Sequence, residues 1–127
     1  MYNFHLSDFI SRFNNCIFSS KKILYLRNSI FILSIIKFFK IKGYISKFTC
    51  LGKNILVIIS YKGNLPVVRK IKIVSKPGRR VYSKVKDLSI SSFYNEVFST
   101  DIGIVDTKYA ISINKCGEFL FKIYLNV

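Results

Sequence analysis

Residues 29–42 constrain the fold more than any other segment, because their apolar side chains recur at helical spacing. Phe31 and the apolar residues four, seven and eight positions after it share one broad face of an α-helix. Ser29 can accept a hydrogen bond from the first turn as the N-cap, and Gly43 follows the last residue, where glycine commonly ends a helix. The segment therefore predicts a helix whose apolar face packs into a core.

A first helix is predicted upstream, over residues 6–13, where apolar residues again share one face. Ser7 is its candidate N-cap, and the acid that follows would lie near the positive end of the helix dipole. The asparagines at 14–15 indicate the end of this helix. Residues 23–26 predict a short strand between the two helices.

Turn residues divide the chain after the second helix into strands. Turns at 51–54 and 62–64 separate strand-like runs at 44–49, 55–61 and 67–74. In the last run lysines alternate with isoleucines, so one face is basic and the other is buried. The first lobe is therefore αβαβββ in outline.

The remaining segments predict a mostly-β second lobe with one short helix. They are a short strand at 81–82, a moderately helical segment at 85–93, a polar loop between short strands at 97–105, a helical turn capped by Asp106 and a final strand at 119–125. We expect an α/β chain of the α+β kind, with two small lobes. Residues 1–74 would form the N-terminal lobe and residues 75–127 the C-terminal lobe.

Charge is distributed very unevenly along the chain, whose net charge is +15. Residues 9–86 contain no acid, and only Lys108, Lys115 and Lys122 of the 21 Lys and Arg lie outside that stretch. A folded chain without internal counter-charge repels itself unless an external anion neutralises it. The usual partners are nucleic acid or an anionic membrane surface.

The apolar content raises the alternative of a membrane protein. The longest uncharged run in the most hydrophobic region spans residues 28–36, far short of the ~20 residues that cross a bilayer. The first residues also lack the pattern of a signal or transit peptide. We therefore expect no membrane partner, and either no cleaved presequence or a sequence that is already in mature form.

The central segment, residues 75–82, reads SKPGRRVY and combines a tight turn with cations. Proline followed by glycine favours a β-turn, and Gly78 tolerates a positive φ. Lys76, Arg79 and Arg80 flank the turn. A guanidinium group can donate two parallel hydrogen bonds to the oxygens of one phosphate. The segment fits a phosphate backbone, and its alternative is an ordinary solvated loop.

Metal and enzyme chemistry find little support in the sequence. Cys16, Cys50 and Cys116 form no CxxC pair, and His5 is the sole histidine. Four zinc ligands at the usual spacings cannot be assembled, so we expect reduced, buried thiols. Ser99 has no histidine nearby in sequence, and the acids are few. We predict no catalytic residues, no metal, no cofactor and no small-molecule substrate.

Several motifs together resemble the bacterial-type small-subunit ribosomal protein eight family, nearly end to end. They are DFISRFNN at residues 8–15, the second helix with its GYI exit at 43–45, SKPGRRVY at 75–82, STDIG at 99–103 and GE at 117–118. The central motif is the most specific of these. The spacing from Gly103 to Glu118 needs no gap relative to the family.

The resemblance implies a structural protein that binds an irregular helix in the central domain of small-subunit ribosomal RNA and supports subunit assembly and translation. Its partners would be that RNA and neighbouring small-subunit ribosomal proteins. The RNA-binding residues that it implies are Arg12, Ser29, Lys76, Gly78, Arg79, Arg80, Tyr82, Ser99, Thr100, Gly103, Gly117 and Glu118. Small hydroxyls and backbone donors suit base edges and 2′-hydroxyls at such a site, whereas Lys and Arg supply the salt-dependent attraction.

The chain departs from the family pattern inside the recognition loop and just before residue 117. Asp101 and Ile102 stand where the family has serine and lysine, and Cys116 replaces the first glycine of a pair. The abundance of Ile, Phe, Lys, Asn and Tyr suggests AT-rich codons. We therefore expect an organelle ribosome, mitochondrial rather than plastid, with a bacterial cytoplasm as the alternative. A free-standing basic RNA- or DNA-binding regulator is the main competing function, ahead of an enzyme or a membrane-surface protein.

Overall fold

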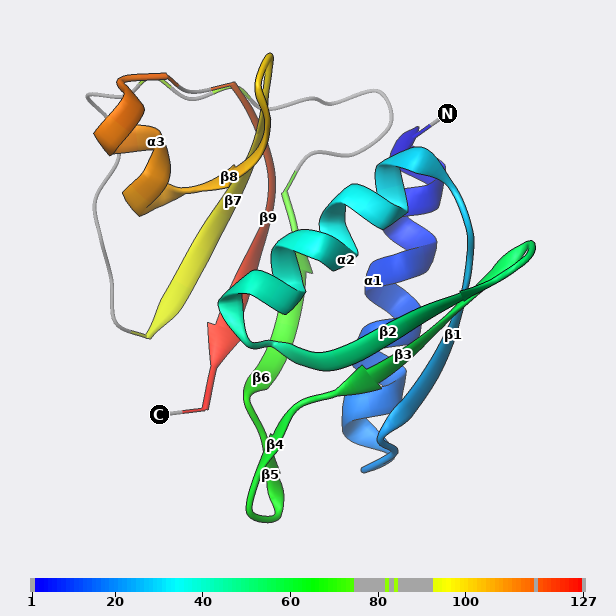
Figure 1. Cartoon of the computed structure of the whole chain (residues 1–127). Coiled ribbons are helices and arrows are strands. Elements are labelled where there is room, and N and C mark those ends of the chain that lie inside the picture. The colour runs from blue at the N-terminus through cyan, green and yellow to red at the C-terminus, as the bar shows by residue number, and fades with distance from the viewer. Residues whose placement is uncertain (1, 75–81, 83, 85–92, 116, 127) are drawn as a thin grey trace.

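The computed structural model describes residues 2–74, 82, 84, 93–115 and 117–126 (Figure 1). Helices α1 and α2 lie side by side along one flank of the molecule, and a shorter helix, α3, lies on the opposite flank. The helical segment expected at 85–93 and most of the SKPGRRVY motif fall outside the described residues, so those expectations stay predictions.

Helix α1 spans Tyr2–Phe18 and is longer at both ends than the sequence predicts. Ser7 therefore lies inside the helix and is not its N-cap. The predicted end at the asparagines is also wrong, because the apolar face continues through Cys16 and Ile17, which are buried. Asn14 does not break the helix, since its side chain donates to the carbonyl of Ile71 and accepts from the N–H of Ile71, both at 2.8 Å. This residue thus fastens α1 to β6 (Val68–Ile73).

Helix α2 spans Ile30–Lys42 and confirms the strongest sequence prediction. Ser29 is the N-cap, and its hydroxyl accepts from the N–H of Ile32 at 3.2 Å. Gly43 has φ of 82° and ends the helix in the left-handed conformation. Phe39 is fully buried, and its ring lies 5.5 Å from the rings of Phe9 and Phe13.

The N-terminal lobe contains a three-stranded antiparallel sheet in the order β1-β3-β2. Its strands are β1 (Ile23–Arg27), β2 (Ile45–Leu51) and β3 (Asn54–Ile59). A small hairpin follows, formed by β4 (Tyr61–Lys62) and β5 (Leu65–Pro66). The predicted strands and both turns are confirmed here. The thiols differ from one another, because Cys16 is buried whereas Cys50, on β2, is exposed, contrary to the expectation.

A four-stranded antiparallel sheet in the order β6-β9-β7-β8 forms the second layer. Its other strands are β7 (Tyr94–Thr100), β8 (Gly103–Asp106) and β9 (Glu118–Leu125). Strand β6 comes before the central motif, yet it pairs with β9 near the end of the chain. Its alternating lysines and isoleucines give it one exposed face and one buried face. The division of the chain at residue 74 stays a prediction.

Asp106 caps the short helix α3 (Thr107–Ile113), as the sequence predicts. The short strands expected within 97–105 are confirmed as parts of β7 and β8. The polar loop between them is shorter than expected, because Ser99 and Thr100 pair with Ile104 and Gly103. Only Asp101 and Ile102 lie between the two strands. Val97 and Phe98 are both buried, at a point where the register of β7 against β9 shifts, and pairing of β7 with β8 continues beyond them to Thr100.

One hydrophobic core joins both sheets to α1 and α2. It includes Phe39 of α2 and Phe121 of β9, whose ring centroids are 6.1 Å apart. A smaller cluster, with Phe98 and Ala110 at its centre, lies between α3 and the other face of the four-stranded sheet. Within the described ranges, no helix has the length and apolar character needed to cross a membrane.

Candidate nucleic-acid interface

The β7–β8 turn brings together three of the residues that the sequence marks for RNA binding. Thr100 and Gly103 are paired at the end of the hairpin, and Ser99 pairs with Ile104 one step further in. The hydroxyl of Thr100 donates to the carbonyl of Gly103 at 3.0 Å and accepts from the N–H of Ile102 at 3.3 Å. Thr100 therefore shapes the turn itself.

Asp101 lies at the exposed tip of this turn. Its carboxylate pairs with Lys115 at 3.3 Å, a lysine that lies between α3 and β9. From the sequence alone, this acid could accept from a backbone N–H, from a base amino group or from a nearby lysine such as Lys108, and the structure brings Lys115 to it. A carboxylate near RNA phosphates would be repelled by their negative charge. The positive charge of Lys115 offsets part of that repulsion.

Gly117 packs against the same end of the sheet. A β-carbon at this position would overlap the carbonyl oxygen of Ser99 and lie 3.2 Å from its carbonyl carbon. Only glycine therefore allows the chain to pass this close to β7. The next residue, Glu118, pairs with Ser99 across the β7–β9 ladder, so the two motifs meet although they are far apart in the sequence.

Glu118 and Tyr82 differ in what they can offer a ligand. Glu118 is 5% exposed and lies inside the protein rather than on the surface. Tyr82 forms an isolated bridge with Glu118 and is 67% exposed. The end of the sheet thus presents a tyrosine, hydroxyls and glycine backbone. We define the hairpin end as Tyr82, Ser99, Thr100, Gly103 and Gly117.

The other expected residues do not join the hairpin end. Arg12 lies on α1 and is paired with Asp8, with its Nε 3.0 and 3.1 Å from the two carboxylate oxygens. Ser29 uses its hydroxyl as the cap of α2. Both belong to the N-terminal lobe, whose α1 lies away from α3 in Figure 1. Four further candidates fall outside the described residues: Lys76, Gly78, Arg79 and Arg80.

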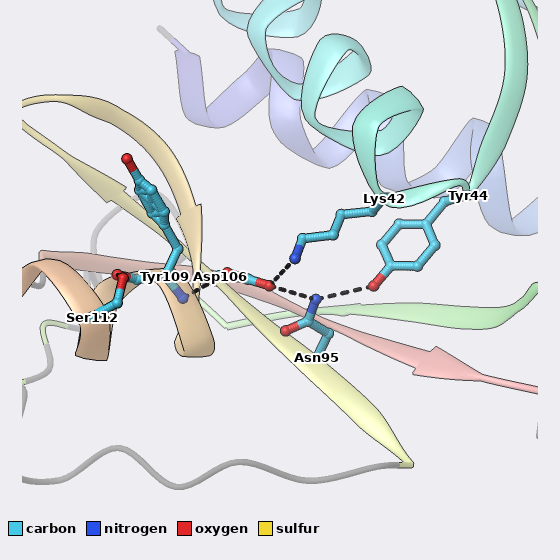
Figure 2. Close-up of polar contacts among 6 residues, drawn as sticks. All are labelled: Lys42, Tyr44, Asn95, Asp106, Tyr109 and Ser112. Carbon is cyan, nitrogen blue, oxygen red and sulfur yellow. Dashed lines mark hydrogen bonds and ion pairs between the residues drawn. The ribbon is translucent and has the colours of Figure 1, made fainter.

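A polar network holds the hairpin to the N-terminal lobe, and the sequence alone did not point to it (Figure 2). Lys42, at the end of α2, forms an ion pair with the buried carboxylate of Asp106. The amide of Asn95 donates to Tyr44 Oη at 3.0 Å and to Asp106 Oδ2 at 3.4 Å. Because Asp106 also accepts from the N–H of Tyr109 at 3.0 Å, one carboxylate links α2, β7 and α3.

The pKa of Asp106 reflects this setting. Burial alone would raise the pKa, but hydrogen bonds from Lys42 and from the N–H of Tyr109 outweigh it. The positive charge of Lys42 and the amide of Asn95 add to them, so the pKa of Asp106 lies below its usual value of 3.8. The carboxylate of Asp106 is therefore ionised at neutral pH. The residues that contact it are distant in sequence, so only the tertiary fold reveals this network.

α3 itself is short and locally braced. The hydroxyl of Ser112 donates to the carbonyl of Tyr109 at 2.7 Å within the helix (Figure 2). Asn114 ends the helix with φ of 56°, in the left-handed region that asparagine tolerates. Lys115 and Gly117 come soon after the helix end, and both contact the end of the β7–β8 hairpin, at Asp101 and at Ser99 respectively.

Comparison with known proteins accounts for this combination of fold and motifs. Residues 5–124 match the family described as ribosomal protein S8. The chain belongs to this family. Its relatives within the S8 family include "Small ribosomal subunit protein uS8" of Neorickettsia sennetsu, which is 30% identical over 98% of this chain and 100% of that protein.

Other relatives show that the likeness is not confined to one group of bacteria. The proteins of the same name from Afipia carboxidovorans and Mycoplasmopsis pulmonis are 36% and 33% identical. The alignments cover 94% of this chain in both cases, with 96% and 95% of the respective relatives. S8 family membership therefore extends over both sheets and includes the hairpin end.

Proposed function

We propose that the protein is a structural component of the small ribosomal subunit. In this proposal its hairpin end binds an irregular helix in the central domain of the small-subunit ribosomal RNA, and the bound protein supports subunit assembly and translation. The observation that carries the proposal is the meeting of the STDIG and GE motifs at one end of a sheet, in a chain of the S8 family. The proposed partners are that RNA and neighbouring small-subunit ribosomal proteins.

The chemistry of the hairpin end favours a distorted RNA helix over a regular one. A regular A-form helix hides its base edges in a deep, narrow groove, whereas a bulged helix exposes them together with 2′-hydroxyls. Ser99 is partly exposed, and Gly103 is exposed with φ of 125°, so RNA can approach the backbone closely there. Tyr82 offers an exposed ring on which an unpaired base could stack.

Charge supplies the remaining affinity. The net charge of +15 attracts the phosphate backbone without regard to sequence. Arg79 and Arg80 of the central motif are proposed to bind phosphates next to the hairpin end, and Lys76 and Gly78 belong to the same proposed turn. Arg12 and Ser29 are proposed as contacts of the N-terminal lobe with RNA.

The compartment is proposed from composition. Abundant Ile, Phe, Lys, Asn and Tyr favour an AT-rich gene, which is typical of small organelle genomes. We propose an organelle ribosome, mitochondrial rather than plastid. The relatives named above are bacterial, and a bacterial cytoplasm is the alternative.

The test is reconstitution with small ribosomal subunits that have been stripped of their own S8-family protein. The tagged chain should co-sediment with the subunits in high salt, and Ser99→Ala should release it at lower salt than the wild type. Ser34→Ala is the matched control, because Ser34 lies on α2, away from the hairpin, and its hydroxyl bonds only its own helix, to the carbonyl of Ile30 at 3.0 Å. Binding to free RNA without entry into subunits would instead identify a free-standing regulator.

A further inference from the structure

Part of the four-stranded sheet has an outer face that no helix of the described structure covers. Ile71 and Ile123 pair across β6 and β9 and are buried in the main core. Their neighbours along each strand point the other way, because successive side chains alternate. On that side, α3 packs near β8 over Phe98 and Phe119. The rest of that side, here called the outer sheet face, carries Lys70, Lys72, Tyr94, Glu96, Lys122 and Tyr124.

The outer sheet face has several cations close together and little negative charge to balance them. Lys72 and Lys122 stand directly opposite across the β6–β9 ladder, a position in which like charges repel. Glu96 faces Lys122 from β7 and is the single acid of this face within the part of the chain that the structure describes. With Lys70 and the adjacent Arg69, four cations share one carboxylate. A surface of this kind is stabilised by an external polyanion.

Two tyrosines form a platform beside these cations. Tyr94 and Tyr124 are opposite each other in the β7–β9 ladder, with ring centroids 6.1 Å apart. Lys122 Nζ lies 4.8 Å from the centroid of Tyr94, and Lys70 Nζ lies 5.0 Å from that of Tyr124. The guanidinium of Arg69 lies 5.5 Å from the ring of Tyr124. Aromatic rings flanked by cations are the pattern that binds unpaired nucleotides, by base stacking and phosphate contact together.

The platform borders a depression large enough for a base. Its volume is about 440 Å³, and it is lined by Arg69, Phe93, Tyr94, Tyr124, Leu125 and Asn126. It lies at the opposite end of β7 from Ser99 and Thr100, since Tyr94 is the first residue of that strand. Ser99 lies five positions after Tyr94 along the strand, a span of roughly 17 Å. The depression is therefore separate from the hairpin end.

We propose that the outer sheet face is a second RNA-binding surface, which takes an unpaired stretch of the ribosomal RNA that the hairpin end also binds. Bases stack on Tyr94 and Tyr124, and phosphates lie against Lys70, Lys72 and Lys122. The proposal rests on the proposed function and names a further part of the same partner. RNA fits better than an acidic protein, because the tyrosines and the adjoining depression offer stacking in addition to charge.

The first experiment measures stacking. The probe is a fluorescein-labelled oligouridylate of about fifteen nucleotides, which cannot form a helix and is within the usual site sizes for single strands. In the full chain, the double variant Tyr94→Leu, Tyr124→Leu should bind it at least about tenfold more weakly than the wild type. The matched control Tyr25→Leu changes an exposed tyrosine on β1, in the three-stranded sheet, and should bind the probe as the wild type does. Circular dichroism and thermal unfolding would show whether the double variant keeps the fold.

The second experiment keeps the proposal falsifiable should the tyrosine variant fail to fold. Lys72→Gln should raise the melting temperature, because it removes a repelling pair, and should at the same time reduce the log–log salt slope by about 0.7. The matched control is Lys47→Gln, an exposed lysine on β2 whose partner across the ladder is Ile58. This control should change neither the melting temperature nor the slope.

Two outcomes would overturn the second surface. One is an unchanged salt slope in Lys72→Gln, and the other is displacement of the oligouridylate by polyglutamate as readily as by unlabelled oligouridylate. Neither result would contradict the proposed function, because that function is tested separately by co-sedimentation of the wild type with small subunits. A wild type that binds oligouridylate but does not enter subunits would overturn the proposed function, and with it the assignment of this face to ribosomal RNA.

Discussion

At the scale of single residues, Asp106 and Gly117 each have a role that depends on the identity of the residue. Asp106 is 3% exposed yet charged, and it caps α3 while pairing with Lys42. Gly117 lets β9 begin against β7, where a larger residue would overlap the backbone. Both roles depend on neighbours that are distant in sequence, so residue type alone does not show them.

Asp106→Asn should destabilise the protein by about 1–3 kcal/mol at neutral pH, because Lys42 then loses its buried partner. The sign of the pH effect follows from the lowered pKa of Asp106. The carboxylate stabilises the fold above the pKa of the unfolded chain, about 3.9, and that contribution is lost as pH falls through the lower folded pKa. Urea unfolding between about pH 7 and pH 2.5 measures it. An Asn variant that loses stability as steeply as the wild type below pH 4 would contradict this prediction.

Gly117→Ala should cost about 1–3 kcal/mol or more, because the added methyl group forces β7 and β9 apart. Chemical denaturation measures the loss. Gly52→Asn is the control, since Gly52 has φ of 62° with open space around it, and asparagine tolerates that conformation. Equal losses in the two variants would mean that the approach to Ser99 does not matter.

At the scale of elements, the β7–β8 hairpin and the SKPGRRVY motif carry the proposed contacts with RNA at the hairpin end. The hairpin is stiffened at its tip by Thr100 and anchored at its base by the Asn95 and Asp106 contacts (Figure 2). Asp101 departs from the family, but its pairing with Lys115 turns a carboxylate into part of an ion pair. The exposed tip of the hairpin therefore carries an acid whose charge Lys115 offsets.

Asp101→Ser should leave RNA affinity level or raise it slightly, because it removes a negative charge from the exposed tip. Lys115→Gln is the informative partner variant, since it leaves Asp101 unneutralised and should weaken binding. Affinity for a bulged small-subunit RNA hairpin, measured by filter binding, tests both. A loss of more than about 1 kcal/mol in Asp101→Ser would show that this carboxylate makes a specific base contact.

The central turn supplies an electrostatic prediction. Changing both Arg79 and Arg80 to Ala should reduce the log–log salt slope of RNA binding by about one to two units, since each phosphate contact contributes about 0.7–0.9. Gly78→Val should also harm folding or binding if Gly78 has a positive φ. A salt titration of the double variant measures the first effect, and an unchanged slope would remove both arginines from the interface.

At the scale of the whole molecule, one core makes the two lobes interdependent. Phe39 of α2 contacts aromatic rings of α1 and of β9, and Asn14 fastens α1 to β6. The Lys42–Asp106 pair adds a polar link between the lobes. Each lobe thus positions the other, which fits a protein whose proposed RNA contacts lie on both.

Phe39→Ala should destabilise the whole protein by about 3–5 kcal/mol, because it empties the centre of the shared core. Hydrogen exchange should show that amides of β3 and of β7 lose protection together, in one cooperative unit. The control is Phe38→Ala, since Phe38 is only partly buried beside the core and should cost less. Loss of protection in β3 alone would show that the lobes unfold separately.

The sequence determined the features that rest on local rules. Capping and periodicity located α2, because Ser29 and Gly43 act on the helix next to them. Turn residues likewise placed β1 to β3, and motif resemblance identified the family. Alternation along β6 predicted one basic and one buried face. The extent of α1 was missed, because Asn14 disfavours a helix by propensity, and its bonds to Ile71 and the burial of Cys16 and Ile17 override that preference.

The tertiary structure alone decided which distant residues meet. It placed β6 beside β9, set Lys72 against Lys122, and brought Gly117 onto the carbonyl of Ser99. It also chose Lys115 as the partner of Asp101. Pairings of this kind depend on sheet register and on the packing of a shared core, which are set by contacts between segments far apart in the chain and leave no local pattern in the sequence.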